Sequence, residues 1–258
     1  QNQLRFEREV LLASKLTHPN TINIYDFGRT ANDSFYFAME YLQGINLSQL
    51  SNMSGSVSAD RVVHILLQIC YSLREAHHKG LIHRDIKPQN IMLCEIGDMY
   101  DVVKVLDFGL VKDIEDETTE DLTKLFEIGG TPMYMSPERL TAPQSVDYRT
   151  DIYSVGVIAY FLLTARKPFL AGVSDIDIIN QVINENPLEI TDTNIPVDLS
   201  EVIYKCLEKD PADRPADMNE LIALLEKLNP HSWTQKQAES WWEEKVNSKN
   251  SDIDSFLN

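Results

Sequence analysis

The sequence predicts an α+β fold in which a small strand-containing amino-terminal part precedes a larger helical part. Two observations predict this fold. Aromatic and β-branched residues separated by turn residues occupy 22–41, whereas apolar residues at helical spacing dominate from residue 59 onward. With 258 residues, of which 43% are hydrophobic, the chain is long enough for one large domain or two small lobes.

The first predicted helix spans residues 4–16 and ends near Pro19, since the residue before a proline disfavours helical geometry. Its apolar residues fall on one stripe, made of Phe6, Val10, Ala13 and Leu16. Two antiparallel strands are expected next, one beginning near Ile22 and one over 35–41, with turn residues at 32–33 between them.

A long helix is predicted over 59–79, where apolar residues again recur at helical spacing. Beyond it, short strands at 91–94 and 102–106 are expected to pair as a hairpin. Asn90 precedes the first of these strands and Asp107 follows the second. The hairpin therefore brings these two side chains to the same end of a cleft.

The almost wholly apolar stretch 151–163 is predicted to be the central helix of the helical part. Helical periodicity then resumes in three further segments, at 174–184, 200–208 and 217–228.

A last amphipathic helix is predicted over 234–246. Thr234 and Gln237 have the spacing of a capping box, and Trp241 and Trp242 lie near one side of the helix. We expect this helix to pack on the helical part, and binding of a partner through its tryptophans is the alternative.

The composition and charge of the chain indicate which classes of binding partner and site are unfavourable. With 40 acidic and 23 basic residues the formal charge is -17, which favours simple solubility and disfavours binding to nucleic acid or anionic membranes. Cys70, Cys94 and Cys206 lack disulfide or zinc-ligand spacing, as is typical of a reducing cytosol. No apolar run reaches the roughly 18 residues of a membrane span, so we expect a cytoplasmic chain, with a membrane tether outside it left open.

The most specific signal is His-Arg-Asp-Ile-Lys-Pro-Gln-Asn over 83–90, followed by Asp-Phe-Gly from Asp107. Asp85 can orient a substrate hydroxyl, and Lys87 can neutralise a transferring phosphoryl group. Asn90 and Asp107 offer the hard oxygen ligands that magnesium prefers. Phosphoryl transfer needs such groups because its transition state spreads negative charge over several oxygens.

At these motifs the chain resembles the eukaryotic-type serine/threonine protein kinases, and its wording Asp-Ile-Lys-Pro-Gln-Asn looks like that of bacterial members. The resemblance runs almost end to end through further motifs in family order: Glu9, His18-Pro19-Asn20, Met39-Glu40-Tyr41 before Gly44, Gly130-Thr131-Pro132 through Glu138, Asp151 through Gly156, and Asp213-Arg214-Pro215.

This resemblance implies a two-lobe protein kinase-like fold with a truncated amino-terminal β-lobe and a large helical carboxy-terminal lobe. The small-lobe remnant would span 1–42, the large lobe 43–230 and a tail 231–258. The implied activity transfers the γ-phosphoryl group of ATP, with Mg²⁺, to Ser/Thr hydroxyls of protein substrates.

By the same resemblance Asp85, Lys87 and Asn90 are catalytic, while Asn90 and Asp107 are the metal ligands. The residues implied to bind the nucleotide are Glu9, Met39, Glu40, Leu42, Met92 and Asp107. Simpler roles are the alternatives: Asp85 could cap backbone amides, and the methionines could fill the core.

Supporting roles are also implied. His83 would pack under Phe108, Asp151 would hold the catalytic loop backbone, and Glu138 would pair with Arg214. Between Asp107 and Glu138, Thr131 is expected to form a hydrogen bond with the catalytic aspartate. The same segment contains three candidate phosphorylation sites, Thr118, Thr119 and Thr123.

The amino-terminal end departs from the family. No glycine precedes Gly28, so the Gly-rich loop is absent, and Lys15 follows Glu9 in the same predicted helix, so it cannot be the family's strand lysine. Because the chain opens with Gln1, we expect a fragment of a longer product with little activity by itself. The alternative is a catalytically inactive pseudokinase that serves as a scaffold or binding module.

Overall fold

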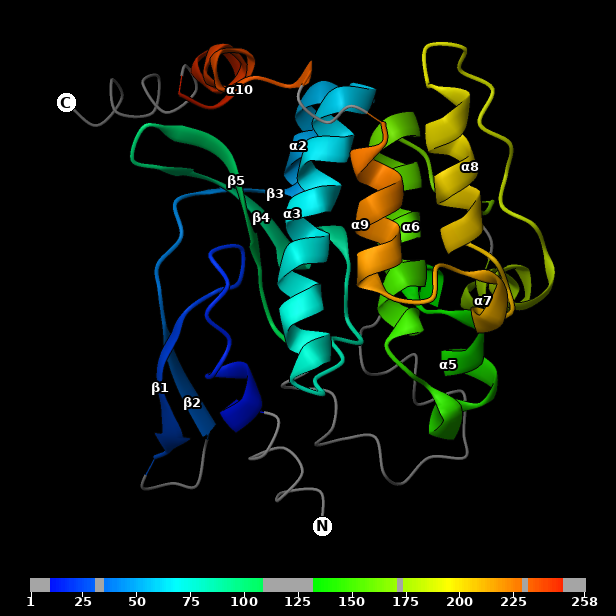
Figure 1. The fold of residues 1–258 in the computed structure, drawn as a ribbon, viewed down its shortest axis with the longest axis horizontal. Helices are drawn as coiled ribbons and strands as arrows, with labels where there is room; N and C mark the ends of the chain where they lie inside the picture. Colours follow the sequence, from blue (N-terminus) through cyan, green and yellow to red (C-terminus); the bar gives the residue numbers. More distant parts are fainter. Residues whose placement is uncertain (1–9, 31–34, 109–131, 171–173, 229–231, 248–258) are drawn as a thin grey trace.

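The computed structural model describes residues 10–30, 35–108, 132–170, 174–228 and 232–247, and the helix and strand labels below are those of Figure 1. The small amino-terminal part contains a helical turn at 10–13 and two antiparallel strands, β1 (Ile24–Arg29) and β2 (Phe35–Met39). Both predicted strands are thus confirmed.

The apolar stripe of the first predicted helix is confirmed where the structure describes it. Val10, Ala13 and Leu16 are all buried, and the amide of Ser14 bonds the carbonyl of Val10 at 2.9 Å. The remaining stripe residue, Phe6, lies outside the described residues.

A second sheet has the strand order β3 (Gly44–Asn46), β4 (Ile91–Ile96), β5 (Met99–Val105), with antiparallel neighbours. The predicted hairpin is confirmed, although its strands extend further toward the turn than 91–94 and 102–106. Strand β3 passes so close to β4 that a Cβ on Gly44 would lie 2.1 Å from the Leu93 carbonyl oxygen. Only glycine fits at this crossing.

Neither β3 nor the helix after it, α2 (Leu47–Ser54), was predicted. Three residues are too few to show an alternating pattern, and β3 exists because β4 supplies its hydrogen-bond partners. The start of α2 is fixed by a capping box in which the side chains of Asn46 and Gln49 each bond the other's backbone amide.

The larger part of the described chain is helical, and its long helices lie side by side around α3 (Ala59–His78) and α6 (Arg149–Thr164) (Figure 1). Helix α3 contacts α9 and α6, and α6 contacts α8. The other helices are α5 (Pro137–Thr141), α7 (Asp175–Asn184), α8 (Val197–Cys206), α9 (Met218–Glu226) and α10 (Gln235–Trp242), with short segments η1 (Pro88–Asn90), η4 (Pro132–Tyr134), η5 (Pro143–Ser145), η6 (Pro211–Asp213) and the π-helical η8 (Glu243–Asn247).

The predicted helices of this part are confirmed, with one shift in position. Helix α8 begins at Val197 and ends at Cys206, whereas the apolar pattern predicted 200–208. The cause is visible at its first turn, where Val197 is 70% exposed and therefore contributes nothing to the buried stripe that begins at Leu199.

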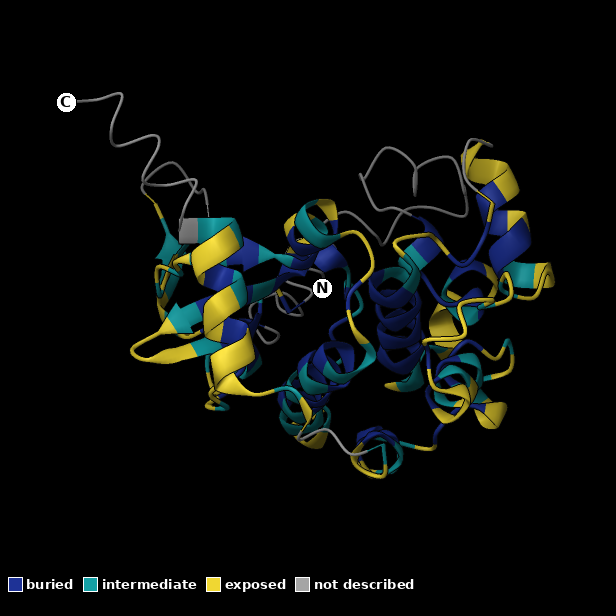
Figure 2. Ribbon diagram, turned by 90° about the horizontal axis from the view of Figure 1, so that it is seen from above, coloured by how far each residue is buried: buried dark blue, intermediate teal, exposed yellow. Residues whose placement is uncertain are grey.

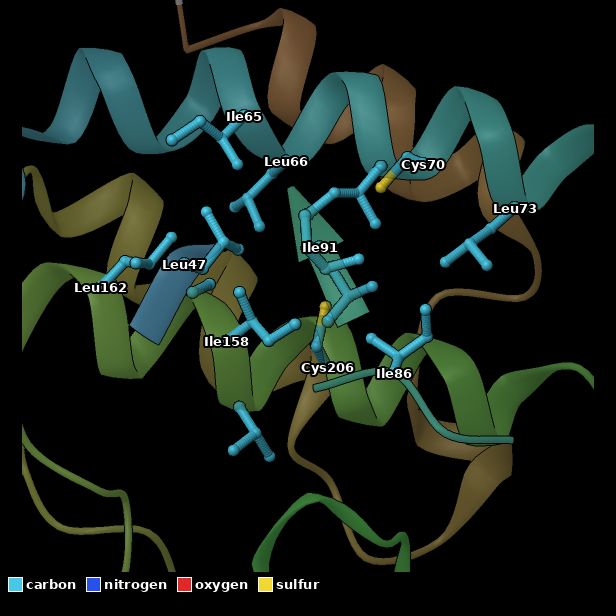
Figure 3. Packing of buried hydrophobic residues seen from close by; sticks show 14 of the residues in the cluster. Leu47, Ile65, Leu66, Cys70, Leu73, Ile86, Ile91, Ile158, Leu162 and Cys206 are labelled. Atoms are coloured by element: carbon cyan, nitrogen blue, oxygen red, sulfur yellow. The ribbon is translucent and has the colours of Figure 1, made fainter. Parts of the chain in front are cut away.

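The hydrophobic core lies between α3, α6, α8 and the β4–β5 hairpin. Figure 3 shows Leu66 and Cys70 of α3 facing Ile158 of α6 and Cys206 of α8 across this space, and all four are buried. Nearly every residue of α6 is buried, whereas the outer faces of the surrounding helices are exposed (Figure 2). Helix α6 is therefore the central buried helix of this part, and α3 and α8 pack against it.

Helix α10 packs on β5 of the hairpin, and Trp233 and Trp241 lie over Arg61 of α3, so the predicted packing is confirmed. The capping box between Thr234 and Gln237 is formed. The indole N–H groups of Trp233 and Trp242 donate to the two carboxylate oxygens of Asp101, at 3.0 and 2.7 Å. Asp101 also binds the Arg61 guanidinium at 2.8 Å. Trp233 and Trp242 thus bind a residue of the same chain.

Arg61 is enclosed by the same segment. The centre of its guanidinium lies 4.0 Å from the ring centroid of Trp241 and 5.0 Å from that of Trp233. Both Arg61 and Asp101 are buried, so the aromatic rings shield an ion pair that solvent does not reach.

Among the described helices, none combines the length and apolarity needed to cross a bilayer.

Candidate active site

The first turn of α6 holds the loop that carries the chemical residues. The Asp151 carboxylate accepts hydrogen bonds from the amides of His83 and Arg84, both at 2.9 Å, and from His77 Nε2 at 2.8 Å. Burial by itself would raise the pKa of Asp151, but the hydrogen bond and charge of His77 and the His83 contact outweigh it and lower that pKa. The expected tie between Asp151 and the catalytic loop is confirmed.

These bonds hold a strained piece of backbone. Arg84 has a φ of 63°, a left-handed conformation that non-glycine residues rarely adopt. With its amide fixed by Asp151, the chain turns sharply at this point, and Asp85 follows directly. The buried carboxylate of Asp151 therefore fixes the backbone conformation directly before Asp85.

Asp85, Lys87 and Asn90 form one cluster. Lys87 Nζ lies 2.8 Å from Asp85 Oδ2, and Asn90 Nδ2 donates to the same oxygen at 3.0 Å and to the Asp85 carbonyl at 2.9 Å. Because the amide nitrogen of Asn90 is engaged with Asp85, its amide oxygen is the end that can meet a cation. The three predicted catalytic side chains are thus brought together.

Asp107 lies beside this cluster. The register of the hairpin pairs Ile91 with Val105, and the Leu106 amide donates to the Asn90 carbonyl at 2.9 Å. Asp107 then adopts a left-handed φ of 48°, which leaves its side chain exposed while the next residue, Phe108, is buried. The hairpin therefore places Asn90 and Asp107 at one end, as predicted.

His83 packs against Phe108, with ring centroids 4.6 Å apart, as the sequence led us to expect. Its Nε2 donates to the Leu106 carbonyl at 2.7 Å, and its Nδ1 accepts from the Asp85 amide at 3.2 Å. One nitrogen donates and the other accepts, which defines a neutral ring. Burial lowers the pKa of His83 as well, so the neutral ring is a fixed support and not a group that shuttles protons.

The predicted nucleotide-binding residues are only partly brought together. Met39 and Asp107 line one small cavity of about 70 Å³ between the two parts of the chain, with Phe108, Ala13 and Phe37 also in its wall. Two other candidates are not in that wall: Leu42 lies between β2 and β3, and Met92 lies within β4. Glu9 and Thr131 lie outside the described residues, as do Thr118, Thr119 and Thr123.

Glu40 is one of the predicted nucleotide contacts, but its side chain has a structural role. Its amide already donates to the Asn23 carbonyl at 3.0 Å, and its Oε1 accepts from the Asn23 amide at 2.7 Å and from Lys104 Nζ at 2.8 Å. Lys104 lies on β5 and is only 5% exposed. This ion pair joins the segment after β2 to the strand that leads to Asp107.

Sequence reasoning missed two supporting residues, each of which carried a signal. Lys104 is a charged residue inside the apolar stretch of β5, a pattern that predicts a buried partner. His77 belongs to none of the motifs, yet it lies four positions after Leu73 on the buried face of α3, where a polar side chain needs a partner such as Asp151. The predicted pair of Glu138 and Arg214 is confirmed as a two-pronged contact at 2.8 and 2.7 Å.

Comparison with known proteins gives consistent matches. The family profile described as protein kinase domain matches residues 1–234. The chain is 40% identical over 231 residues to serine/threonine-protein kinase pkn3 of Myxococcus xanthus, covering 87% of this chain and 42% of that protein. It is 36% identical over 227 residues to serine/threonine-protein kinase PknB of Mycobacterium leprae, covering 86% of this chain and 35% of the relative. The chain thus spans less than half the length of these curated relatives.

A solved structure is also similar. The crystal structure of Rad53 1-466 in complex with AMP-PNP superimposes with a TM-score of 0.69 and 26% sequence identity, covering 84% of this chain and 53% of the other. The superposition supports the two-part architecture with small sheets and many helices described above.

Proposed function

The chain belongs to the protein kinase domain family, and we propose that it is the part of a longer serine/threonine protein kinase that positions the acceptor hydroxyl and the metal-bound phosphates of ATP. The observation that carries the proposal is the cluster of Asp85, Lys87 and Asn90, which the Leu106–Asn90 hydrogen bond joins to Asp107. The names of the relatives support Ser/Thr hydroxyls of proteins as acceptors.

In the proposed mechanism Asp85 accepts a hydrogen bond from the attacking hydroxyl and orients it. Lys87, already 2.8 Å from Asp85, neutralises charge on the transferring phosphoryl group. Asn90 and Asp107 would hold Mg²⁺, whose positive charge draws negative charge from the phosphates. Their oxygen donors at the end of one hairpin fit this ion. Glu9, Met39, Glu40, Leu42 and Met92 are the proposed contacts for the remainder of the nucleotide.

The alternative function, a non-catalytic scaffold, is not favoured. A scaffold does not need Asp85, Lys87, Asn90 and Asp107 together, whereas phosphoryl transfer does. A cytoplasmic location and the absence of a nucleic-acid partner remain parts of the proposal, supported by the acidic composition.

The decisive experiment is a phosphoryl-transfer assay on the full protein that contains this chain, with Mg²⁺ and ATP and with phosphoserine and phosphothreonine measured by mass spectrometry. Asp85→Asn should lower kcat by about 10²- to 10⁴-fold, because it removes the group that orients the hydroxyl. Asp198→Asn, an exchange at an exposed position on α8, is the matched control and should leave kcat unchanged. A wild-type protein that binds the nucleotide but transfers no phosphate would favour the scaffold.

A further inference from the structure

One face of α3 makes hydrogen bonds to the segment that joins the amino-terminal helical turn to β1. Gln68 Oε1 accepts from Asn20 Nδ2 at 2.9 Å, and Ser72 Oγ lies 2.7 Å from Thr21 Oγ1. Lys79 Nζ bonds the Lys15 carbonyl. Three of the contacting residues, Gln68, Ser72 and Glu75, belong to α3, and Lys79 is its C-cap. Their spacing of three and four places them on one side of the helix.

Glu75 makes the densest of these contacts. Its two carboxylate oxygens accept from the Thr17 amide at 3.1 and 3.0 Å, from the Thr17 hydroxyl at 3.1 Å and from the His18 amide at 2.9 Å. Lys79 Nζ adds a contact at 2.7 Å. Hydrogen bonds to an ionised carboxylate are stronger than neutral ones, and among the described contacts Glu75 makes more bonds to this segment than Gln68, Ser72 or Lys79.

The protonation of Glu75 agrees with this geometry. Burial by itself would raise its pKa, but the hydrogen bonds from Lys79, His18 and Thr17 outweigh it and lower the pKa to about 2. The carboxylate is therefore ionised at neutral pH. It also satisfies two consecutive backbone amides that would otherwise lack a partner at the end of the amino-terminal helical segment.

The same turn of α3 reaches the catalytic loop from its other side. His77, two residues after Glu75, bonds Asp151, and Asp151 holds the amides of His83 and Arg84. Ala13, just before the segment that Glu75 grips, lines the cavity shared with Asp107 and Phe108. A single helical turn thus connects the segment beside Asp107 with the loop that carries Asp85.

We propose that Glu75 is a positioning residue for phosphoryl transfer, which fixes the segment 13–18 relative to Asp107 and the catalytic loop by holding the amides of Thr17 and His18. The proposal rests on the proposed kinase function, because its consequence is a defined distance between the wall of the nucleotide site and the metal ligand. Glu75 touches neither reacting atoms nor nucleotide in this arrangement and acts through the backbone that it holds.

The test compares Glu75→Ala and Glu75→Gln in the full protein with Glu226→Gln as the matched control. Glu226 also accepts a hydrogen bond from α3, from the Tyr71 hydroxyl at 2.8 Å, but this contact is with α9, away from the segment 13–18. In Glu75→Ala the amides of Thr17 and His18 should exchange hydrogen at least about tenfold faster, as expected for loss of a charge-assisted bond. Glu75→Gln, which keeps one acceptor oxygen, should be intermediate.

The second readout separates positioning from simple support. Glu75→Ala should raise the KM for ATP by about tenfold while the KM for the protein substrate stays unchanged, since only the nucleotide side of the site moves. Unchanged exchange at Thr17 and His18, or faster exchange with an unchanged KM for ATP, would each overturn the proposal. If Glu75→Ala does not fold, as judged by circular dichroism, the same criteria are applied to Glu75→Gln.

The result does not depend on turnover. If the wild-type protein transfers no phosphate, the proposed function fails, but binding of AMP-PNP with Mg²⁺ still measures the nucleotide site. A weaker affinity for AMP-PNP in Glu75→Ala than in wild type and Glu226→Gln would support the positioning role. Equal affinities in all three proteins would reject it.

Discussion

Trp242 donates its indole N–H to Asp101 Oδ1 at 2.7 Å across 141 positions of sequence, and both side chains are buried. This bond closes the carboxy-terminal helix onto the hairpin that carries Asn90 and Asp107 at its other end. The family match ends at residue 234, immediately before that helix begins at Gln235. The folded unit described here therefore extends beyond the matched region.

Replacing Trp242 with phenylalanine should lower the free energy of unfolding by about 1–3 kcal/mol, because a buried carboxylate loses one of its donors. The measurement is urea-induced unfolding followed by circular dichroism. Trp241→Phe is the control, since Trp241 stacks on Arg61 and makes an edge contact with the Trp242 ring but is not a donor to Asp101, so the exchange should cost less than about 1 kcal/mol. Equal losses in the two variants would show that the hydrogen bond to Asp101 contributes little.

Arg214→Lys should destabilise the protein by about 2–3 kcal/mol although the charge is retained. Arg214 is buried and contacts both oxygens of Glu138 as well as the carbonyls of Glu208 and Lys209, and a lysine cannot make this planar set of bonds. Thermal and urea unfolding would measure the loss.

The control for this exchange is Arg149→Lys. Arg149 makes a similar two-pronged contact with Asp147, but both side chains are about a third exposed, so the exchange should cost less than about 1 kcal/mol. A cost as large as that of Arg214→Lys would mean that burial does not account for the difference.

Lys104→Met should lower the free energy of unfolding by about 1–3 kcal/mol, because Glu40 would keep its charge without its buried partner. Adding Glu40→Gln should recover part of that loss, which a double-mutant cycle in urea would measure. An additive double variant would contradict a direct coupling between these side chains.

Acid should weaken the wild-type protein more than Glu75→Gln. The pKa of Glu75 is lowered from 4.5 to about 2 in the folded chain, so its contribution to stability is fully present above about pH 4.5 and is lost as the pH falls toward 2. The difference in unfolding free energy between wild type and Glu75→Gln should therefore shrink between about pH 5 and pH 3. A difference that is constant over this range would contradict the lowered pKa.

Much of the fold could be predicted because local patterns determine it. The hairpin, α3, α6 and the capping box at Thr234 all follow from spacing within a few residues. Strand β3 could not be predicted, since its three residues depend on partners in β4 that lie far along the chain.

The candidate site likewise contains residues that the sequence could predict and contacts that it could not. Asp85, Lys87, Asn90 and Asp107 lie in short motifs and could be named directly. The contacts of Glu75 with Thr17, of His77 with Asp151 and of Lys104 with Glu40 join residues 58, 74 and 64 positions apart, and periodicity shows only that such groups need partners. It does not show which partners they find.

The arrangement of the tryptophans has a practical consequence. The chain has three, and all surround the ion pair of Arg61 and Asp101, at the opposite end of the hairpin from Asp107. Its tryptophan emission therefore reports on the surroundings of this ion pair and is a poor probe of an occupied nucleotide pocket. Optical titrations with ATP will need a dye on the ligand, while the natural signal is a ready probe for detachment of the terminal helix.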